Sequence, residues 1–494
     1  MAPPCHPIPA PVRVRAMALP MSSDTASLAK LCMRSTDLRR AFEETLASLV
    51  EIPSVSMDPE RRGDVDKVAQ AGAELLRDLG AQVDIVKTAG LPLVVGRLVQ
   101  DPAFPTVTIY NHLDVQPADP EEWKSPPFQL TRAGQTWRGR GTTDDKGPAL
   151  TALFGARLAL QDDVPLNFQF LWETEEEIGS PSFAGALAKL VKAGLCTDSV
   201  VVSDTMWSRA GQPAIPYGLR GLMGFLVRLR TGDKDVHSGT VGGGARNPIT
   251  ELSALIAECV DARTGKVKIP GFYAGVRQLN AAEKRRLAGD GFSRRDFQAA
   301  HGLSSVRFSD AQKLHAAVTV APTFEVHGIT GGYTGAGIKT IVPHQAEAKL
   351  SCRLVSDQKP DQVFRLVQGF IKKRCPDAEV IHEASLSPYL VDPSGPHLEA
   401  AQEAMREAFG KRACLTREGG SIGAVVTMDQ LLKAPVVMLG LSLPEHGYHA
   451  IDENFDWGQA SQGMAMFCHY FHSLAALPAR ARGGKKRSLT KSKS

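Results

Sequence analysis

Residues 106–117 read TVTIYNHLDVQP, a β-branched and apolar run that ends in His112 and Asp114. A run of this kind predicts a buried strand. Comparable apolar runs occur at residues 93–99, 168–172 and 200–203. The stretch 147–160, which lies between two of these runs, has helical character. Strands that alternate with helices predict an α/β fold with a mainly parallel sheet flanked by helices.

Polar side chains follow several of these predicted strands directly. In an open α/β sheet, ligands bind at the carboxyl ends of the strands. Each group also has an ordinary explanation, because adjacent acids can cap a helix, acid runs are usually solvated and a His–Asp pair can lie on the surface. The candidates are His112 and Asp114, Asp144 and Asp145, Glu173, Glu175, Glu176 and Glu177, Asp204, and His446 and His449.

Taken together, these groups favour a metal site. Imidazole and carboxylate ligands without thiolates suit Zn²⁺, Mn²⁺ or Co²⁺, and a shared carboxylate suits two such ions about 3.5–4 Å apart. His112 and Asp114 are two residues apart in extended chain and cannot easily reach one ion. We therefore expect His112 to be a ligand and Asp114 to orient its imidazole. Four acids directly after a buried strand are better tolerated with cations nearby.

The formal net charge of +4 comes from the two ends of the chain. Residues 480–494 hold seven Lys or Arg and residues 1–20 hold two, neither with an acid, so the body between them carries −5. A nucleic-acid binder should carry its basic patch on the folded body, so we expect no nucleic-acid partner. We expect residues 1–35 to be a flexible extension and residues 478–494 to be a basic, disordered tail.

Cysteine usage and hydropathy bear on the compartment. No stretch approaches the roughly 18 consecutive apolar residues of a membrane span, so we expect no membrane partner. The eight cysteines are scattered without a CxxC pair, and Cys468 in MAMFCHYF lies in an apolar run where cysteine packs as a small hydrophobe. This pattern argues against a disulfide framework, and we expect a reducing compartment, the cytoplasm.

The length of 494 residues favours two domains. From Pro213 the pattern changes to a long strand-like segment, a helix at 249–263 and a charged helical region at 280–316. After Ala378 the first pattern resumes. We expect a discontinuous catalytic domain, residues 36–212 and 379–477, that carries an inserted α/β lid or dimerisation domain, residues 213–378.

The order of the motifs resembles that of the M20 family of metallopeptidases, in particular its cytosolic nonspecific dipeptidase and carnosinase branch. The resemblance covers about residues 38–475. The matching segments are NHLDVQP (111–117), GRGTTDDKGP (139–148), ETEEEIGS (173–180), VVSD (201–204), YGLRG (217–221), DVHSGTVGGGARNP (235–248), GIKTIVP (337–343), SCRLV (351–355), REGGSI (417–422) and HAIDEN (449–454).

The resemblance implies hydrolysis of the amide bond of dipeptides or similar small peptides. The attacking water is bridged between two divalent cations, Zn²⁺ or Mn²⁺, and Co²⁺ also fits. The nearest alternative is another amidohydrolase of the same family, such as a carboxypeptidase, an N-acyl amino-acid deacylase or a carbamoyl amidohydrolase. A more distant alternative is a non-catalytic binding module with the same fold.

The resemblance also implies roles for particular residues. Asp144 resembles the carboxylate that bridges the two ions. His112 and Asp204 resemble the other ligands of one ion, and Glu177 and His449 resemble those of the second.

Further implied roles concern proton transfer and a second subunit. Glu176 resembles the general base, Asp114 resembles the residue that orients His112, and the peptide bond between Asp144 and Asp145 is expected to be cis. His237 in DVHSG is expected to reach the active site of the partner in a homodimer and to stabilise the oxyanion there. By itself, His237 is equally an ordinary loop histidine.

The last implied roles concern the substrate. Arg353 resembles the clamp on the free carboxylate of the substrate, a task that suits a planar guanidinium, although alone it reads as a strand-surface charge. The residues that resemble the lining of the same pocket are Thr340, Gly420 and Ser421.

One segment departs from the family pattern. The branch usually has a histidine followed by Gly-Gly-x-Pro-Trp, whereas this chain reads HEASLSPYLVD at residues 382–392. His382 is displaced, and Tyr389 stands where the tryptophan would fall. The departure leaves open whether His382 replaces the family histidine and whether the specificity is strictly carnosinase-like.

Overall fold

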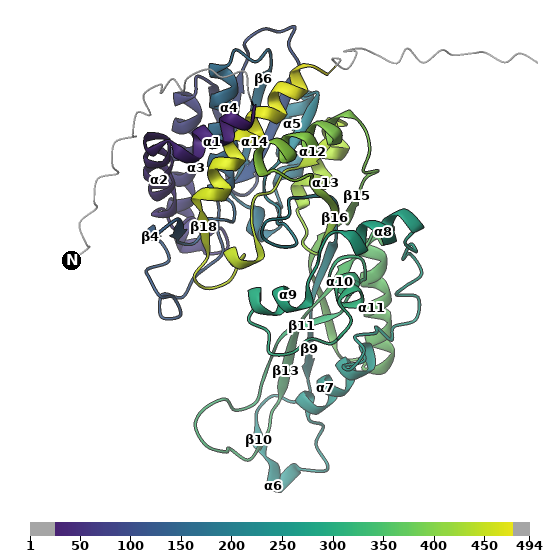
Figure 1. Ribbon diagram of the computed structural model, residues 1–494. Helices are drawn as coiled ribbons and strands as arrows, with labels where there is room; N and C mark the ends of the chain where they lie inside the picture. The colour runs from purple at the N-terminus through teal and green to yellow at the C-terminus, as the bar shows by residue number, and fades with distance from the viewer. Residues whose placement is uncertain (1–24, 478–494) are drawn as a thin grey trace, which may run out of the picture.

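A six-stranded sheet forms the centre of the larger part of the molecule (Figure 1), in the computed structural model, which describes residues 25–477. The strands from β6 to β17 run parallel, and β1 and β2 are antiparallel to their neighbours. This confirms the mainly parallel sheet. The order is β1 (Gln82–Val86), β2 (Leu93–Leu98), β6 (Asn167–Glu173), β3 (Thr106–His112), β7 (Ser199–Val202) and β17 (Val436–Met438).

Helices cover both faces of this sheet, which explains why β6 and β7 are buried at every residue. Alternate strand side chains enter two separate apolar cores. One core lies under α2 (Thr36–Val50), α3 (Arg62–Asp78), α4 (Lys146–Gln161), α12 (Pro396–Phe409) and α14 (Trp457–Ala475). The other lies under α5 (Phe183–Lys192) and α13 (Gly423–Leu432).

The helices α4 and α14 pack in parallel at close range. A Cβ atom on Gly155 would lie 2.4 Å from Cβ of Phe467, and one on Gly463 would lie 2.7 Å from Cγ2 of Thr151. The absence of side chains at these two glycines is what allows the close approach. The helix α4 begins directly after the loop that carries Asp144, and only the short strand β18 (Asn454–Asp456) separates α14 from the loop that carries His449, so the packing of the two helices positions both loops.

The lid is a four-stranded antiparallel sheet with helices on one face. Figure 1 shows it as a separate body beside the larger part, and the hairpin-like tip formed by β10 (Val236–His237) and α6 (Ser238–Val241) lies at its far end. The sheet order is β11 (Glu325–Gly331), β13 (Gln345–Leu354), β9 (Gly221–Arg230) and β14 (Glu379–Leu386). The covering helices are α7 (Pro248–Cys259) and α11 (Pro360–Arg374).

Shorter elements complete the two parts. The charged region 280–316 forms three short helices, α8 (Ala281–Gly289), α9 (Arg294–Ala300) and α10 (Ala311–Thr319). A two-stranded sheet joins β10 to β12 (Ile341–Val342). One three-stranded sheet has the order β15 (Tyr389–Leu390), β8 (Ala214–Leu219), β16 (Cys414–Glu418). A second three-stranded sheet has the order β18 (Asn454–Asp456), β5 (Thr136–Arg138), β4 (Thr131–Ala133). The 3₁₀ turns are η1 (Pro59–Arg61), η2 (Glu176–Ile178) and η3 (Pro444–His446).

The expected boundaries differ from the structure at three places. Residues 25–34, expected as part of a flexible extension, form helix α1 (Thr25–Arg34), and its Ala29 and Cys32 are buried. Strand β14 pairs with β9 and so belongs to the lid, whereas β8 pairs with β15 and β16 outside the lid sheet. These strand pairings join residues that are far apart in the chain, and the local pattern of apolar residues does not specify such pairings. The expected extension 1–24 and tail 478–494 lie outside the described residues.

Within residues 25–477, no helix combines the length and the apolar character that a bilayer crossing requires.

Candidate functional site

The candidate ligands lie at the carboxyl ends of adjacent parallel strands. His112 is the last residue of β3, Asp204 follows β7, and Glu176 and Glu177 form η2 directly after β6. Because β6, β3 and β7 are neighbours in the sheet, these ends meet at one edge. The loops before α4 and β18 bring Asp144 and His449 to the same edge.

Two clusters of metal-ligand atoms share one carboxylate. In the first, Nε2 of His112 lies 3.0 Å from Oδ1 of Asp144 and 3.7 Å from Oδ2 of Asp204. In the second, Nε2 of His449 lies 3.0 Å from Oδ2 of Asp144 and 3.1 Å from Oε2 of Glu177. The two oxygens of Asp144 are therefore divided between the clusters, as a bridging carboxylate requires.

The electrostatics of these clusters fit divalent cations. Burial raises the pKa of Asp204 to about 6, and burial together with the charge of Asp144 raises the pKa of Glu177 to about 7. For Asp144, burial is outweighed by the hydrogen bonds from His112 and His449, which lower its pKa. Two imidazoles alone leave this group of acids short of positive charge, and two cations would balance it. The donor set, imidazole and carboxylate without thiolate, fits the expected metals.

The backbone geometry at Asp144 and the side-chain contacts of Asp145 direct the two carboxylates to different places. The Asp144–Asp145 peptide bond is cis, which confirms the expectation from the resemblance. Oδ2 of Asp145 accepts hydrogen bonds from Nδ2 of Asn111, at 2.7 Å, and from the backbone N–H of His112, at 3.3 Å. Asp145 therefore faces the end of β3, and Asp144 faces the clusters.

Asp114 connects the first cluster to the acidic turn. Its Oδ1 lies 3.4 Å from Nδ1 of His112, whose nearer partner is the backbone carbonyl of Asp114 itself, at 3.0 Å. The same carboxylate accepts the backbone N–H groups of Glu176, at 3.2 Å, and Glu177, at 3.0 Å. Asp114 thus holds both the His112 ring and η2, and the sequence had predicted only the first of these contacts.

The acidic run splits into two structural and two site residues. Glu173 accepts hydrogen bonds from Tyr110 and Ser180, and Glu175 accepts the backbone N–H groups of Leu91 and Ser182. Glu177 belongs to the second cluster.

Glu176 differs from these neighbours. Its carboxylate belongs to neither cluster and makes no hydrogen bond or ion pair within the part of the chain that the structure describes. Burial, only partly offset by the charge of His112, raises its pKa well above the usual value.

Sequence reasoning missed a buried clamp made by Glu453 and Arg140. The Glu453 carboxylate accepts the backbone N–H groups of Gly141, Thr143 and Asp144 at 2.8–3.0 Å. Nη1 of Arg140 donates to the same carboxylate at 2.9 Å. Because Glu453 lies four residues after His449, the clamp ties the two loops that carry Asp144 and His449. Glu453 in the HAIDEN motif and Arg140 in the GRG turn are the sequence features from which this clamp could have been predicted.

Two further side chains support the ligands and were also missed. The Tyr448 hydroxyl donates to Oδ1 of Asp204 at 3.0 Å, and Nε2 of Gln116 donates to Oε2 of Glu177 at 2.7 Å. Tyr448 leaves Oδ2 of Asp204 facing the first cluster, whereas Gln116 bonds the same Glu177 oxygen that approaches His449. Tyr448 precedes His449, and Gln116 lies in the same motif as His112. This proximity in the sequence is the feature from which their supporting roles could have been predicted.

Arg353 and Ser421 contact each other where β13 of the lid meets the loop after β16. Nη1 of Arg353 donates to Oγ of Ser421 at 2.9 Å, and the half-buried guanidinium forms no ion pair with any carboxylate among residues 25–477. Glu418 is the last residue of β16, and Gly420 and Ser421 lie in the loop that follows this strand. Burial and the charge of Asp204 raise the pKa of Glu418 to about 8, and Oε2 of Glu418 has no hydrogen-bond partner in the described chain.

Within one chain, Thr340 does not lie with Arg353 and Ser421, the residues with which it was expected to line the substrate pocket. Its carbonyl accepts the backbone N–H of Ser238 at 2.9 Å, next to His237 at the lid tip. Arg353 lies at the opposite end of β13, a ten-residue strand that spans about 30 Å.

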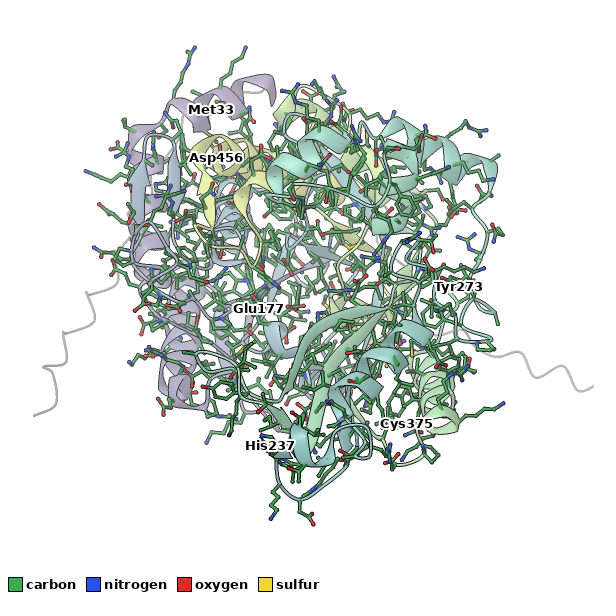
Figure 2. All side chains as sticks on the ribbon, turned by 90° about the horizontal axis from the view of Figure 1, so that it is seen from below. Met33, Glu177, His237, Tyr273, Cys375 and Asp456 are labelled. Carbon is green, nitrogen blue, oxygen red and sulfur yellow. The ribbon has the colours of Figure 1, made fainter. Side chains whose placement is uncertain are left out.

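His237 is exposed at the lid tip. Figure 2 shows Glu177 in the middle of the molecule and His237 at its edge. Nδ1 of His237 accepts the backbone N–H of Gly239 at 3.0 Å. In the neutral ring, Nε2 then carries the proton and is a hydrogen-bond donor.

The departing segment 382–392 is divided between two sheets, with residues 382–386 in β14 of the lid and residues 389–390 in β15. His382 on β14 is exposed, and its Nε2 lies 2.8 Å from Oγ of Ser385. Tyr389 is buried in the core beneath α5 and α13, where it pairs with Leu219.

A lidded α/β sheet with a carboxylate shared between two His–carboxylate clusters defines a class, the dinuclear metallohydrolases. A family model described as peptidase family M20/M25/M40 matches residues 108–473. The chain belongs to this family, which confirms the resemblance seen in the motifs.

Individual relatives agree with this membership. The chain is 32% identical over 458 residues to the Cys-Gly metallodipeptidase dug1 of Schizosaccharomyces pombe, covering 88% of this chain and 96% of the relative. It is 30% identical over 465 residues to the Beta-Ala-His dipeptidase of Rattus norvegicus, covering 88% and 93%. The solved structure of the di-peptidase Dug1p from Saccharomyces cerevisiae superposes with a TM-score of 0.84 at 27% identity, covering 93% of this chain and all of that one.

Proposed function

We propose that this chain is a metal-dependent dipeptidase that uses two divalent cations, Zn²⁺ or Mn²⁺, to hydrolyse the peptide bond of small peptides with free ends. Co²⁺ fits the same donors. The observation that carries the proposal is the division of the two Asp144 oxygens between two His–carboxylate clusters. Relatives that match over most of their length carry the names of Cys-Gly and Beta-Ala-His dipeptidases, which supports this substrate class.

In this proposal the ligands of one ion are His112 and Asp204, those of the other are Glu177 and His449, and Asp144 is shared. The ions supply Lewis acidity, which lowers the pKa of the attacking water and polarises the scissile carbonyl.

The chain itself supplies the proton transfer. Glu176 stands apart from the ligand clusters, and its carboxylate has no partner among residues 25–477, so it is the group that takes the proton from the water and hands it to the leaving amine. Asp114 orients the His112 ring and holds the Glu176 backbone, so it is a positioning residue.

Two charged groups fit the ends of a dipeptide. The Arg353 guanidinium has no carboxylate partner among the described residues, and it suits the free carboxylate of the substrate, with Gly420 and Ser421 lining that side. Oε2 of Glu418, which is affected by the charge of Asp204, has no hydrogen-bond partner in the described part of the chain and suits the free ammonium of the substrate. A substrate with both charges satisfies two buried groups at once.

A substrate panel tests this function. The chain is stripped with a chelator, reconstituted with Zn²⁺, Mn²⁺ or Co²⁺, and assayed on Cys-Gly, β-Ala-His, a dipeptide amide and an N-acetyl amino acid. We expect no activity without metal and cleavage of the free dipeptides with it. Blocking the carboxylate should lower kcat/KM by about 10²-fold, because the Arg353 charge stays unpaired. Faster cleavage of the N-acetyl amino acid would favour the deacylase alternative.

We further propose a homodimer in which His237 acts in the active site of the partner, accompanied by Thr340. The lid tip lies far from the metal ligands of its own chain (Figure 2), and the Nε2–H of His237 suits a developing oxyanion. Strand β11 is an edge of the lid sheet and exposes apolar side chains. The exposed group comprises Val326 and Ile329 on β11, and Tyr333 and Ile338 in the segment that follows it.

Subunit mixing tests this arrangement. The variants His237→Ala and Glu176→Gln should each lose most activity as homodimers. In a hybrid dimer, one site combines an intact Glu176 with the intact His237 of the other chain. Dissociation and reassociation of an equal mixture should therefore restore about a quarter of wild-type activity, since half the dimers are hybrids with one good site each. No recovery in verified hybrids would exclude the action of His237 across the interface.

A reducing compartment such as the cytoplasm remains our proposal for the location. All seven cysteines of the described chain are free, which supports it.

A further inference from the structure

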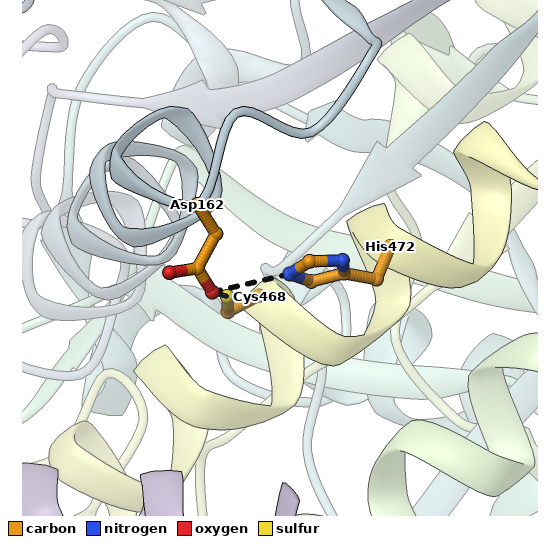
Figure 3. A group of neighbouring side chains, drawn as sticks. All are labelled: Asp162, Cys468 and His472. Carbon is orange, nitrogen blue, oxygen red and sulfur yellow. Dashed lines mark hydrogen bonds and ion pairs between the residues drawn. The ribbon is translucent and has the colours of Figure 1, made fainter. Parts of the chain in front are cut away.

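We propose that Asp162, Cys468 and His472 form a third metal site that holds a zinc ion and joins helices α4 and α14. Figure 3 shows the three side chains converging on one point, with Cys468 and His472 from α14 and Asp162 from the end of α4. None of these residues belongs to the two clusters at the carboxyl ends of the strands.

The ligand atoms lie at separations that suit a single ion. Oδ2 of Asp162 is 3.2 Å from Nε2 of His472 and 3.9 Å from Sγ of Cys468, and all three atoms lie within 4.8 Å of one another. A tetrahedral zinc ion with bonds of about 2.0–2.3 Å keeps its ligand atoms about 3.3–3.6 Å apart. Small side-chain movements therefore bring the three atoms into its first coordination sphere.

The helices place the ligands in a favourable electrostatic position. Cys468 and His472 are four residues apart on α14 and so share one face of the helix. The contacts between α4 and α14 advance in the same direction along both helices, from Thr151 near Gly463, through Gly155 near Phe467, to Asp162 near His472. Both helices therefore point their carboxyl-terminal ends, which carry partial negative charge, toward the cluster. A cation is stabilised there.

The donor types select the metal. A thiolate with an imidazole and a carboxylate suits zinc, whereas Mg²⁺ and Ca²⁺ prefer oxygen ligands alone. The side chains of His472 and Asp162 are 46% and 32% exposed, so the ion can enter from solvent and a water can take the fourth position. On binding, the Cys468 thiol forms its bond to zinc and releases its proton to solvent.

This ion would stabilise the fold without touching the reaction. The helix α4 is 16 residues long, so its two ends are about 24 Å apart. Asp144 precedes one end and Asp162 follows the other. The zinc would hold together two core helices whose opposite ends carry the loops of Asp144 and His449.

Cobalt substitution tests the site in the intact protein. A thiolate bound to Co²⁺ gives a charge-transfer absorption in the near-ultraviolet. The donors of the proposed active centre include no cysteine, so they cannot produce this band. We expect the cobalt-loaded protein to show the band and to hold one equivalent more metal per chain than the active centre requires.

Three variants make the result decisive. His472→Gln changes a largely exposed side chain, so it should fold normally, and it should lose one equivalent of metal and weaken or remove the band. Cys468→Ser should lose both the additional metal equivalent and the charge-transfer band. Cys196→Ser removes an exposed thiol outside the cluster and should keep the metal equivalent and the band. No thiolate band in the wild type, or a band that survives Cys468→Ser, would overturn the proposal. Dipeptidase activity can succeed or fail independently of this outcome.

Discussion

The Glu176→Gln variant should lose about 10²–10⁴-fold in kcat while it keeps both active-site metal equivalents. Glutamine has nearly the shape of glutamate but cannot accept the proton of the attacking water. The Glu176 backbone N–H, which Asp114 binds, is unchanged by the substitution, so η2 should keep its geometry. The measurement is steady-state turnover of a dipeptide together with metal analysis of the same preparation.

The neighbouring acid provides a matched comparison. Glu177→Gln makes the same chemical change one residue later, but at a ligand of the second cluster. We expect this variant to lose metal first and activity as a consequence. Wild-type kcat in Glu176→Gln would refute the proposed base, and metal loss equal to that of Glu177→Gln would make Glu176 a ligand instead.

The Asp144→Ala variant should lose both metal ions and at least about 10³-fold in kcat, because the two ions share this carboxylate. Its two oxygens lie 3.0 Å from Nε2 of His112 and 3.0 Å from Nε2 of His449. Without the shared group, each remaining pair has one imidazole and one carboxylate. Metal titration by calorimetry and activity at saturating metal are the two measurements.

Single-cluster variants separate a bridge from an ordinary ligand. Asp204→Ala should weaken only the ion near His112, and Glu177→Gln only the ion near His449. Loss of a single equivalent in Asp144→Ala, matching either of these variants, would contradict the bridging assignment.

The clamp of Glu453 illustrates why part of the site was visible in the sequence and part was not. Most of the candidate ligands could be predicted because they follow a recognisable strand or glycine-rich turn, and the sheet brings strand ends together. The hydrogen bond from Asp144 to Glu453 joins residues 309 apart in the chain. No local periodicity specifies such a pair, so the support for the ligands became visible only in three dimensions.

The lid shows the same limit. The sequence indicated an inserted α/β unit, but not that β14 completes its sheet or that Thr340 lies before the start of β13 whereas Arg353 lies near its other end. Strand pairing depends on partners far away in sequence, whereas strand existence depends on neighbours two residues apart.

By itself, the sequence determined the mainly parallel sheet, the order of the motifs and the chemical types of the active-site donors. Side-chain periodicity and the residues at strand ends are local properties, so they can be read from the chain alone. Only the tertiary structure decided how the two oxygens of Asp144 are shared, which acids after β6 face the site, and that Cys468 meets His472 and Asp162 rather than serving only as a small core residue. Each of these depends on distances of a few ångströms between segments hundreds of residues apart, and packing of the whole fold sets those distances.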